Sequence, residues 1–315
     1  MSVEPITSPP SLLLFFAFAF GSIVGSFLNV VVWRLPRGES LSHPPSHCPK
    51  CGHSIRAWEN IPILSWLALR GRCSNCAQPI SWRYPLGELS LGLLYAAVTW
   101  NIWRNDLPLA LLPGFFWLTA SLLAAAQIDL KHRIIPDKLN YAGIIVAVLL
   151  SLLLPGSRLI GQELPAPMQA SIISEAVLAW LAKACARTQP WNWRFVALID
   201  LLLGLLLAAI CFLVFYCLEK LPARRHKTEQ RQLMGAGDLK CIAMIAAFLG
   251  ADACIYILLG AAALGFVYGT AQMLWTKKRA GFFSNLPFAP FLAMPTLFWL
   301  VKGNWLYFVY RAPLK

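Results

Sequence analysis

Charge is scarce in this chain, and negative charge is the scarcest. Only 13% of its 315 residues are charged, with 14 Asp and Glu against 27 Lys and Arg. A soluble domain carries about 25% charged residues, so this composition excludes an ordinary soluble protein. The chain is instead 58% hydrophobic, and several of its apolar runs reach the length that crosses a bilayer as a helix. We therefore expect an all-α polytopic membrane protein, with the lipid membrane as its first partner.

The chain also lacks internal repeats, low-complexity tracts and a Gly-rich nucleotide loop between a strand and a helix. Its net charge of +13 raises the alternative of a nucleic-acid partner. The basic residues, however, fall in short segments between apolar runs, where they orient a membrane protein. We therefore predict no nucleic-acid binding.

About eight apolar runs are expected to be transmembrane helices. They cover residues 11–32, 86–103, 107–127, 137–154, 196–217, 239–251, 254–275 and 287–301. The first run has no basic leader and no small-residue cleavage site after it, so we expect a retained span. The last run contains Pro287, Pro290 and Pro295, and is expected to be kinked or partly re-entrant.

These runs divide the chain into five parts. The parts are a first span (1–32), a small tetracysteine domain (33–85), spans two to four (86–154), an insertion (155–195) and spans five to eight (196–315). Most of the Lys and Arg fall on the side of the tetracysteine domain, which predicts that this side is cytoplasmic. The insertion falls on the opposite side, and we expect it to be a spacer.

Four cysteines form two Cys-x-x-Cys pairs, Cys48 with Cys51 and Cys73 with Cys76. Together they supply four thiolates for a tetrahedral Zn²⁺ site of the zinc-ribbon type. In a reducing cytosol a metal is favoured over disulfides, with a redox pair as the alternative. Four protein ligands close the coordination shell, so the predicted Zn²⁺ is structural and not catalytic.

Two acids stand at the edges of apolar runs on the cytoplasmic side. Asp129 follows the third run and Asp238 precedes the sixth. A carboxylate in such a place is costly unless it is used, so each predicts a functional site. Asp238 also opens a helix, where capping is the alternative interpretation. Two close carboxylates cannot both ionise easily, so the pair predicts an aspartyl dyad in which one acid keeps its proton.

The residues before and after Asp238 support this interpretation. Gly235 and Gly237 allow unusual backbone shapes and the close approach of a substrate strand. Lys240 is expected to tune the dyad electrostatically. The expected chemistry is peptide hydrolysis, in which the ionised acid takes a proton from water and the protonated acid polarises the scissile carbonyl.

Longer motifs connect these features to a known family. They are Gly25–Pro36, Glu59–Pro62, Pro79–Pro85, Glu88, Asp129 with Ile135–Asp137, Met234–Lys240 and Pro287–Phe291. In this combination, and over nearly its whole length, the chain resembles the type IV prepilin leader peptidases, which are also called prepilin peptidase/N-methyltransferases and are GxGD membrane aspartyl proteases.

The resemblance implies two activities at the cytoplasmic face of the bacterial inner membrane. The family cleaves the basic leader of prepilins and pseudopilins with the acids that match Asp129 and Asp238. It then N-methylates the new amino terminus with S-adenosylmethionine, and here methylation is implied by the resemblance alone. Glu88 is open to a role in the site or in packing and membrane-edge anchoring.

A zinc-ribbon membrane scaffold or transporter without hydrolytic activity is the alternative function. A transporter would place polar groups near the middle of discontinuous helices. Asp129 and Asp238 lie at the cytoplasmic ends of the runs, which favours the peptidase, and Asp200 is the only clear acid within a run.

Overall fold

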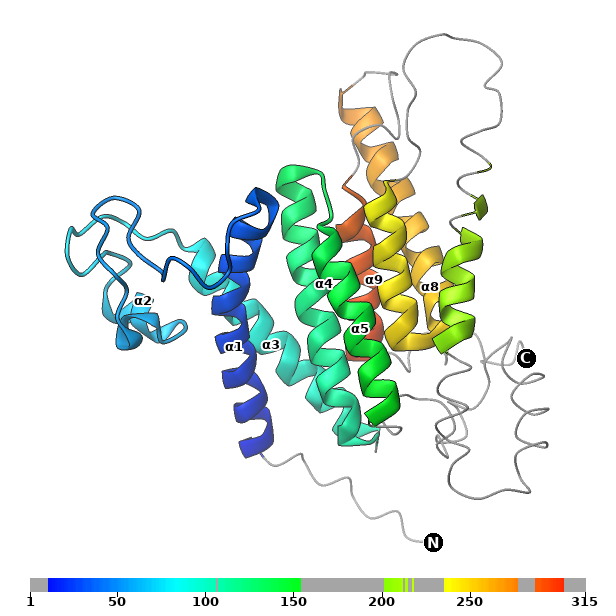
Figure 1. Ribbon diagram of the computed structural model, residues 1–315, viewed down its shortest axis with the longest axis horizontal. Coiled ribbons are helices and arrows are strands. Elements are labelled where there is room, and N and C mark those ends of the chain that lie inside the picture. The colour runs from blue at the N-terminus through cyan, green and yellow to red at the C-terminus, as the bar shows by residue number, and fades with distance from the viewer. Residues whose placement is uncertain are drawn as a thin grey trace, which may run out of the picture. The chain divides into compact units, whose positions relative to one another are not determined.

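The computed structural model describes residues 11–105, 107–153, 201–211, 213–214, 217, 235–276 and 287–302. The regular structure within these ranges is helical and contains no β-strand. Two compact units divide the chain, Met1–Asp106 and Leu107–Lys315 (Figure 1). The predicted insertion 155–195 lies outside the described residues.

Three helical segments in the described ranges are long and apolar enough to cross a bilayer. They are Ser11–Arg37, Leu109–His132 and Ala253–Gln272. Two shorter apolar helices are Leu201–Cys211 and Phe288–Lys302. The prediction of an all-α membrane protein is confirmed at this level.

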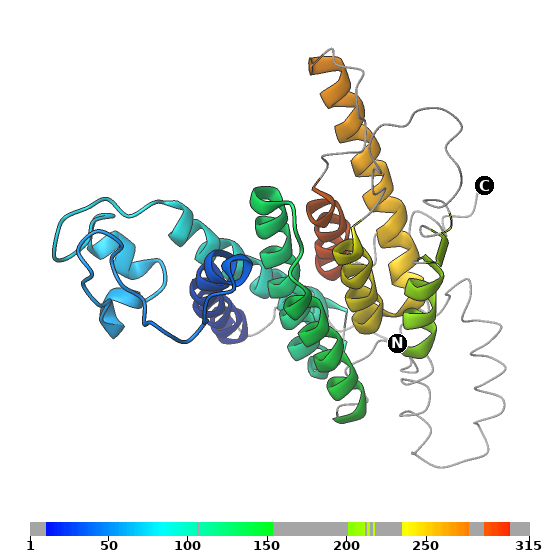
Figure 2. The same ribbon diagram turned by 45° about the horizontal axis from the view of Figure 1, so that its top comes forward.

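In the first unit, α1 (Ser11–Arg34) and α3 (Arg83–Arg104) pack side by side (Figure 2). The short elements between them belong to the tetracysteine segment, namely η1 (Leu35–Arg37), η2 (Ala57–Asn60) and α2 (Leu64–Ala68). The α1 and α3 backbones come close together where Gly25 faces Glu88. A Cβ atom on Gly25 would lie 2.8 Å from the Glu88 Cα, so the contact needs a residue without a side chain.

The second unit is a bundle built on four main elements. They are α4 (Leu112–His132, preceded by η3, Leu109–Leu111), α5 (Asp137–Leu153), α8 (Ala236–Thr276) and α9 (Phe288–Lys302). Helix α9 packs against both α4 and α8, and α5 packs against the same two helices (Figures 1 and 2). Fully buried apolar side chains fill the space between them, including Leu118, Leu122, Ile128, Ile242, Met244, Ile245 and Leu292.

Helix α8 is two arms joined at Gly250. This residue has φ 83° and ψ 176°, a backbone conformation that essentially only glycine adopts. The chain turns back there, so the yellow and orange arms lie side by side in both views (Figures 1 and 2). The break falls at the end of the predicted run 239–251.

Helix α4 continues beyond the predicted end at residue 127. It ends at His132, and Arg133 then adopts a left-handed conformation with φ 58°. The Arg133 N–H donates to the Asp129 carbonyl at 2.9 Å, which closes the last turn. Lys131 and His132 lie in that turn and complement the helix dipole. Asp129 therefore lies inside the last turn of α4, and not after the helix as the sequence suggested.

Candidate active site and metal site

Asp129 lies in α4 and is held by the start of another helix. Its side chain is buried, with 5% exposed. The Ala289 N–H, in the first turn of α9, donates to Asp129 Oδ2 at 2.9 Å. Unpaired N–H groups and the positive end of the dipole both favour a carboxylate at a helix N-terminus. The burial cost of Asp129 is thus offset by α9.

Asp238 lies in the first turn of α8 and is half-buried. The Gly235 N–H donates to Asp238 Oδ2 at 3.0 Å, and the Asp238 N–H donates to the Gly235 carbonyl, also at 3.0 Å. The first bond is the half of a capping box in which the third residue reaches back to the N-cap N–H, and the second is an ordinary backbone bond, because Gly235 has no side chain. Asp238 is therefore the third residue of the helix and not its N-cap residue, and one of its carboxylate oxygens stabilises the helix start.

The structure brings the two acids into one site. Asp129 comes from the end of α4 and Asp238 from the start of α8, within the same unit. Helix α9, whose Ala289 N–H holds Asp129, packs against both α4 and α8, so one set of packed helices carries both acids. Each carboxylate accepts a hydrogen bond from a backbone N–H near the start of a helix. An aspartyl dyad requires two such carboxyl groups that share one proton.

The GxGD turn, residues 235–238, packs against the segment that leads into α5. A Cβ atom on Gly237 would lie 3.1 Å from the Ile135 carbonyl oxygen and 3.2 Å from its Cβ. The absent side chain of Gly237 therefore makes room for Ile135 of the same chain. On Gly235, a Cβ would meet only the Asp238 carboxylate, at 3.3 Å or more.

Lys240 links α8 to α5 through an ion pair. Its Nζ lies 2.7 Å from Asp137 Oδ2 and 5.1 Å from the centre of the Tyr141 ring. Both partners belong to the first two turns of α5. The positive charge of Lys240 thus points toward α5. The negative charge of Asp137 beside it reduces any electrostatic effect of Lys240 on Asp129 and Asp238.

Glu88 of the first unit is buried, with 8% exposed. Its Oε2 accepts the Ile63 N–H at 2.7 Å. Ile63 has φ 63° and ψ −52°, and the Leu64 N–H donates to the Pro62 carbonyl at 2.6 Å across it. This is the rarer and strained kind of γ-turn, and it is unusual for a β-branched residue. Glu88 therefore ties the turn that leads into α2 to helix α3.

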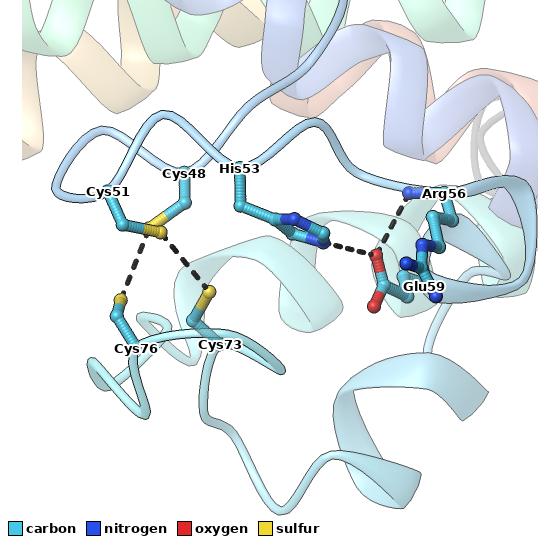
Figure 3. A network of polar contacts seen from close by, with 7 residues as sticks. All are labelled: Cys48, Cys51, His53, Arg56, Glu59, Cys73 and Cys76. Atoms are coloured by element: carbon cyan, nitrogen blue, oxygen red, sulfur yellow. Dashed lines mark hydrogen bonds and ion pairs between the residues drawn. The ribbon is translucent and has the colours of Figure 1, made fainter.

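The four predicted cysteines form a compact cluster (Figure 3). Their sulfur atoms all lie within 4.8 Å of one another. The Cys48 and Cys76 sulfurs are 3.8 Å apart, and those of Cys51 and Cys73 are 4.0 Å apart. Zn–S bonds of about 2.3 Å in a tetrahedron would place the sulfurs about 3.8 Å apart, whereas a disulfide needs about 2 Å. The cluster therefore has the geometry of a metal site.

The two cysteine pairs are built by the same backbone turn. In each turn, the N–H of the first cysteine donates to the carbonyl of the residue five positions later. The carbonyl of the same cysteine accepts a hydrogen bond from the N–H of the residue four positions later. The hydrogen bonds are Cys48–His53 and Gly52–Cys48 at 2.9 Å each, Cys73–Gln78 at 2.8 Å and Ala77–Cys73 at 3.0 Å. The fifth residue of each turn has positive φ, 70° at Gly52 and 55° at Ala77.

Backbone N–H groups of the first turn lower the pKa of two of the four thiols, which favours their thiolate forms. The backbone N–H groups of Cys51 and Lys50 lower the pKa of the Cys48 thiol to about 6, and the His53 N–H lowers the pKa of Cys51. At Cys76 the Gln78 N–H lowers the pKa, but burial and the three other sulfurs raise it to about 11. Thiolates bind metals, and four of them at this spacing repel one another unless a cation lies between them.

Glu59 stabilises the loop after the first cysteine pair, a role that the sequence did not reveal. Its Oε2 accepts the Arg56 N–H at 2.9 Å and lies 3.2 Å from His53 Nε2 (Figure 3). The Arg56 N–H, followed by the Ser74 hydroxyl and His53, lowers the Glu59 pKa to about 2. The ionised carboxylate therefore holds His53, two residues after Cys51, against the segment that begins η2.

Comparison with known proteins identifies the family of the chain. Residues 19–102 match a family model described as the Bacterial Peptidase A24 N-terminal domain, and residues 116–270 match the Type IV leader peptidase family. No solved structure matches the chain significantly.

Curated relatives cover almost the whole chain. A prepilin leader peptidase/N-methyltransferase of Stutzerimonas stutzeri is 32% identical over 96% of this chain and 95% of the relative. One of Pseudomonas putida is 32% identical over 95% and 93%. A type 4 prepilin-like proteins leader peptide-processing enzyme of Escherichia coli O78:H11 is 30% identical over 90% and 92%. The chain therefore belongs to the type IV leader peptidase family.

Proposed function

We propose that this chain cleaves the leader peptides of type IV prepilins and pseudopilins and then N-methylates the new amino terminus. One observation carries the proposal. Asp129 and Asp238 lie at the ends of two helices that both pack against α9, and each carboxylate accepts a backbone N–H, in a chain of the type IV leader peptidase family. The methylation rests on the names of the relatives.

In the proposed reaction the ionised member of the dyad takes a proton from a water molecule. The resulting hydroxide attacks the carbonyl carbon of the scissile peptide bond, while the protonated member hydrogen-bonds the carbonyl oxygen. The leaving amine then takes a proton from the dyad. Backbone N–H groups from α8 and α9 hold one oxygen of each carboxylate, which orients the pair before the substrate binds.

The proposed topology follows from the distribution of basic residues. About eight helices cross the bacterial inner membrane, and the dyad and segment 33–85 face the cytoplasm. The five parts are 1–32, 33–85, 86–154, 155–195 and 196–315. A prepilin would dock its apolar helix among the spans and present its leader at the depth of the acids.

Two cofactors belong to the proposal. Cys48, Cys51, Cys73 and Cys76 would hold a structural Zn²⁺ in a zinc-ribbon-like domain, where it supplies a cross-link and no chemistry. S-adenosylmethionine would be the methyl donor. Glu88 and Lys240 are proposed as supporting residues that connect neighbouring elements to the sites.

The test is prepilin cleavage by the purified protein, with mass spectrometry of the product. The wild type should remove the leader and, with S-adenosylmethionine present, add one methyl group. Asp129→Asn and Asp238→Asn should each abolish cleavage, whereas Glu39→Gln, which changes an exposed acid of the first unit, should retain it. Cleavage by either dyad variant at the wild-type rate would favour the non-hydrolytic scaffold or transporter.

A further inference from the structure

Asn140 is a fully buried amide next to the GxGD turn. It lies one turn into α5, and its side chain is 0% exposed. Its Nδ2 donates to the Gly237 carbonyl at 3.2 Å. Because a carbonyl oxygen can only accept, this contact fixes which end of the amide faces the turn. The hydrogen bond joins α5 to the residue immediately before Asp238.

The bond acts on the peptide that carries Asp238. The C=O of this peptide belongs to Gly237 and is held by Asn140, while its N–H belongs to Asp238 and is held by the Gly235 carbonyl. Both ends of the peptide are therefore fixed. The carboxyl group of Asp238 is held as well, by the Gly235 N–H. Asn140 is the one partner in this set that comes from outside the turn.

The amide is costly in this position, so packing alone does not explain it. Asn140 Oδ1 is buried without a hydrogen-bond partner in the part of the chain that the structure describes. A leucine would fill a similar volume without burying an unpaired acceptor. The donor on Nδ2 is the feature that a leucine cannot supply.

The rest of the α5 start cannot fix the same peptide. The Ile135 carbonyl packs against the Cα of Gly237, but a carbonyl oxygen cannot donate a hydrogen bond to the Gly237 carbonyl. The Asp137–Lys240 ion pair joins side chains that are both partly exposed, at 55% and 28%. Such pairs are weak and tolerate movement of long side chains. Asn140 is short, buried and directed at the backbone itself.

We propose that Asn140 is a positioning residue for the cleavage reaction, which holds the Gly237–Asp238 peptide so that the Asp238 carboxyl meets the water and the scissile bond. This inference rests on the proposed function of the dyad. Asn140 acts through Asp238 and does not touch the reacting atoms. Its loss should slow the chemical step and leave prepilin binding largely intact.

The test measures kcat and KM of prepilin cleavage together with thermal unfolding. Asn140→Leu removes the donor, and Asn140→Thr offers a hydroxyl donor in its place. Ser151→Val is the matched control, because Ser151 is also buried in α5 and its hydroxyl donates to the Ala147 carbonyl of its own helix. Asp238→Asn is assayed alongside to test the dyad itself.

We expect Asn140→Leu to lower kcat by about tenfold or more, with KM within about threefold, as the loss of one orienting hydrogen bond would produce. Asn140→Thr should recover much of that loss, and Ser151→Val should keep the wild-type kcat. A wild-type kcat in Asn140→Leu would overturn the inference. So would equal losses of kcat in Asn140→Leu and Ser151→Val, because the effect would then be structural. If Asp238→Asn is active, the proposed function fails instead.

Discussion

At the scale of single residues, the site depends on where a side chain is missing as well as on where one is present. Gly237 packs its Cα side against Ile135, while Gly235 faces only the Asp238 carboxylate. The two glycines of the GxGD turn therefore differ in how much they tolerate a methyl group. Forcing an atom into a packed backbone contact costs about 1–3 kcal/mol.

This difference gives a matched pair of variants. Gly237→Ala should displace the turn and reduce prepilin cleavage by about tenfold or more, a change that corresponds to about 1.4 kcal/mol. Gly235→Ala should lose less activity, because its Cβ requires a shift of only a few tenths of an ångström at the Asp238 carboxylate and leaves the backbone of the turn in place. Initial rates at equal amounts of inserted protein would measure both. Equal rates for the two variants, or a larger loss in Gly235→Ala, would contradict this reading of the turn.

Sequence reasoning found the residues whose presence is costly. An acid beside an apolar run and four spaced cysteines have few explanations other than a site, so Asp129, Asp238 and the cysteine pairs were predictable. The groups that hold the acids were not. Ala289 acts through a backbone N–H, which every residue except proline has, and Asn140 is an uncharged amide at the start of an apolar run.

At the scale of elements, the two cysteine turns repeat one geometry with unequal residues. The position with positive φ is glycine in the first turn and alanine in the second, with φ 70° at Gly52 and 55° at Ala77. The left-handed conformation costs an L-residue roughly 1–2 kcal/mol, while glycine adopts it freely. The second turn is thus the more strained of the two.

Exchanging these residues should change the metal site in opposite directions. Ala77→Gly should relieve strain and slow the loss of Zn²⁺ to a chelator, and Gly52→Ala should accelerate it. No neighbouring atom lies within 4 Å of a Cβ on Gly52, so the effect reports the backbone alone. The release rate, followed with a colorimetric chelator, measures this. Faster release from Ala77→Gly than from the wild type would show that the turn is not strained.

The helices themselves were largely predictable from apolar runs, and their ends were less so. Helix α4 exceeds its apolar run because Lys131, His132 and the left-handed Arg133 complete its last turn after the hydrophobic pattern has ended. The strained turn at Ile63 had no sequence signal, because it is imposed by its tertiary contact with Glu88 and contradicts the preference of a β-branched residue.

At the scale of the whole molecule, the two proposed sites belong to separate units. The tetracysteine cluster lies in Met1–Asp106, and both acids lie in Leu107–Lys315. The low charge and high hydrophobicity of the chain were enough to predict a helical membrane protein. They did not predict how its parts divide, because that depends on which helices share buried contacts.

This separation predicts that metal and cleavage can be uncoupled. The purified wild type should contain about one Zn²⁺ per chain, the number that four thiolate ligands bind. The double variant Cys48→Ser/Cys73→Ser should lose the metal and retain prepilin cleavage. Cys217→Ser, an exposed cysteine outside the cluster, is the control and should keep both. Metal analysis and cleavage are measured on the same preparation. Loss of cleavage together with the metal, in correctly inserted protein, would show that the dyad depends on the first unit.

The central claim is that Asp129 and Asp238 act as one catalytic unit. The most direct measurement is the single-turnover rate of prepilin cleavage for Asp129→Asn, Asp238→Asn and the double variant. Residues that act as a unit are strongly non-additive. The account predicts that each single variant loses nearly all activity and that the double variant is no slower than either. If the two losses multiply in the double variant, or if one acid can be replaced without effect, the acids do not form a dyad.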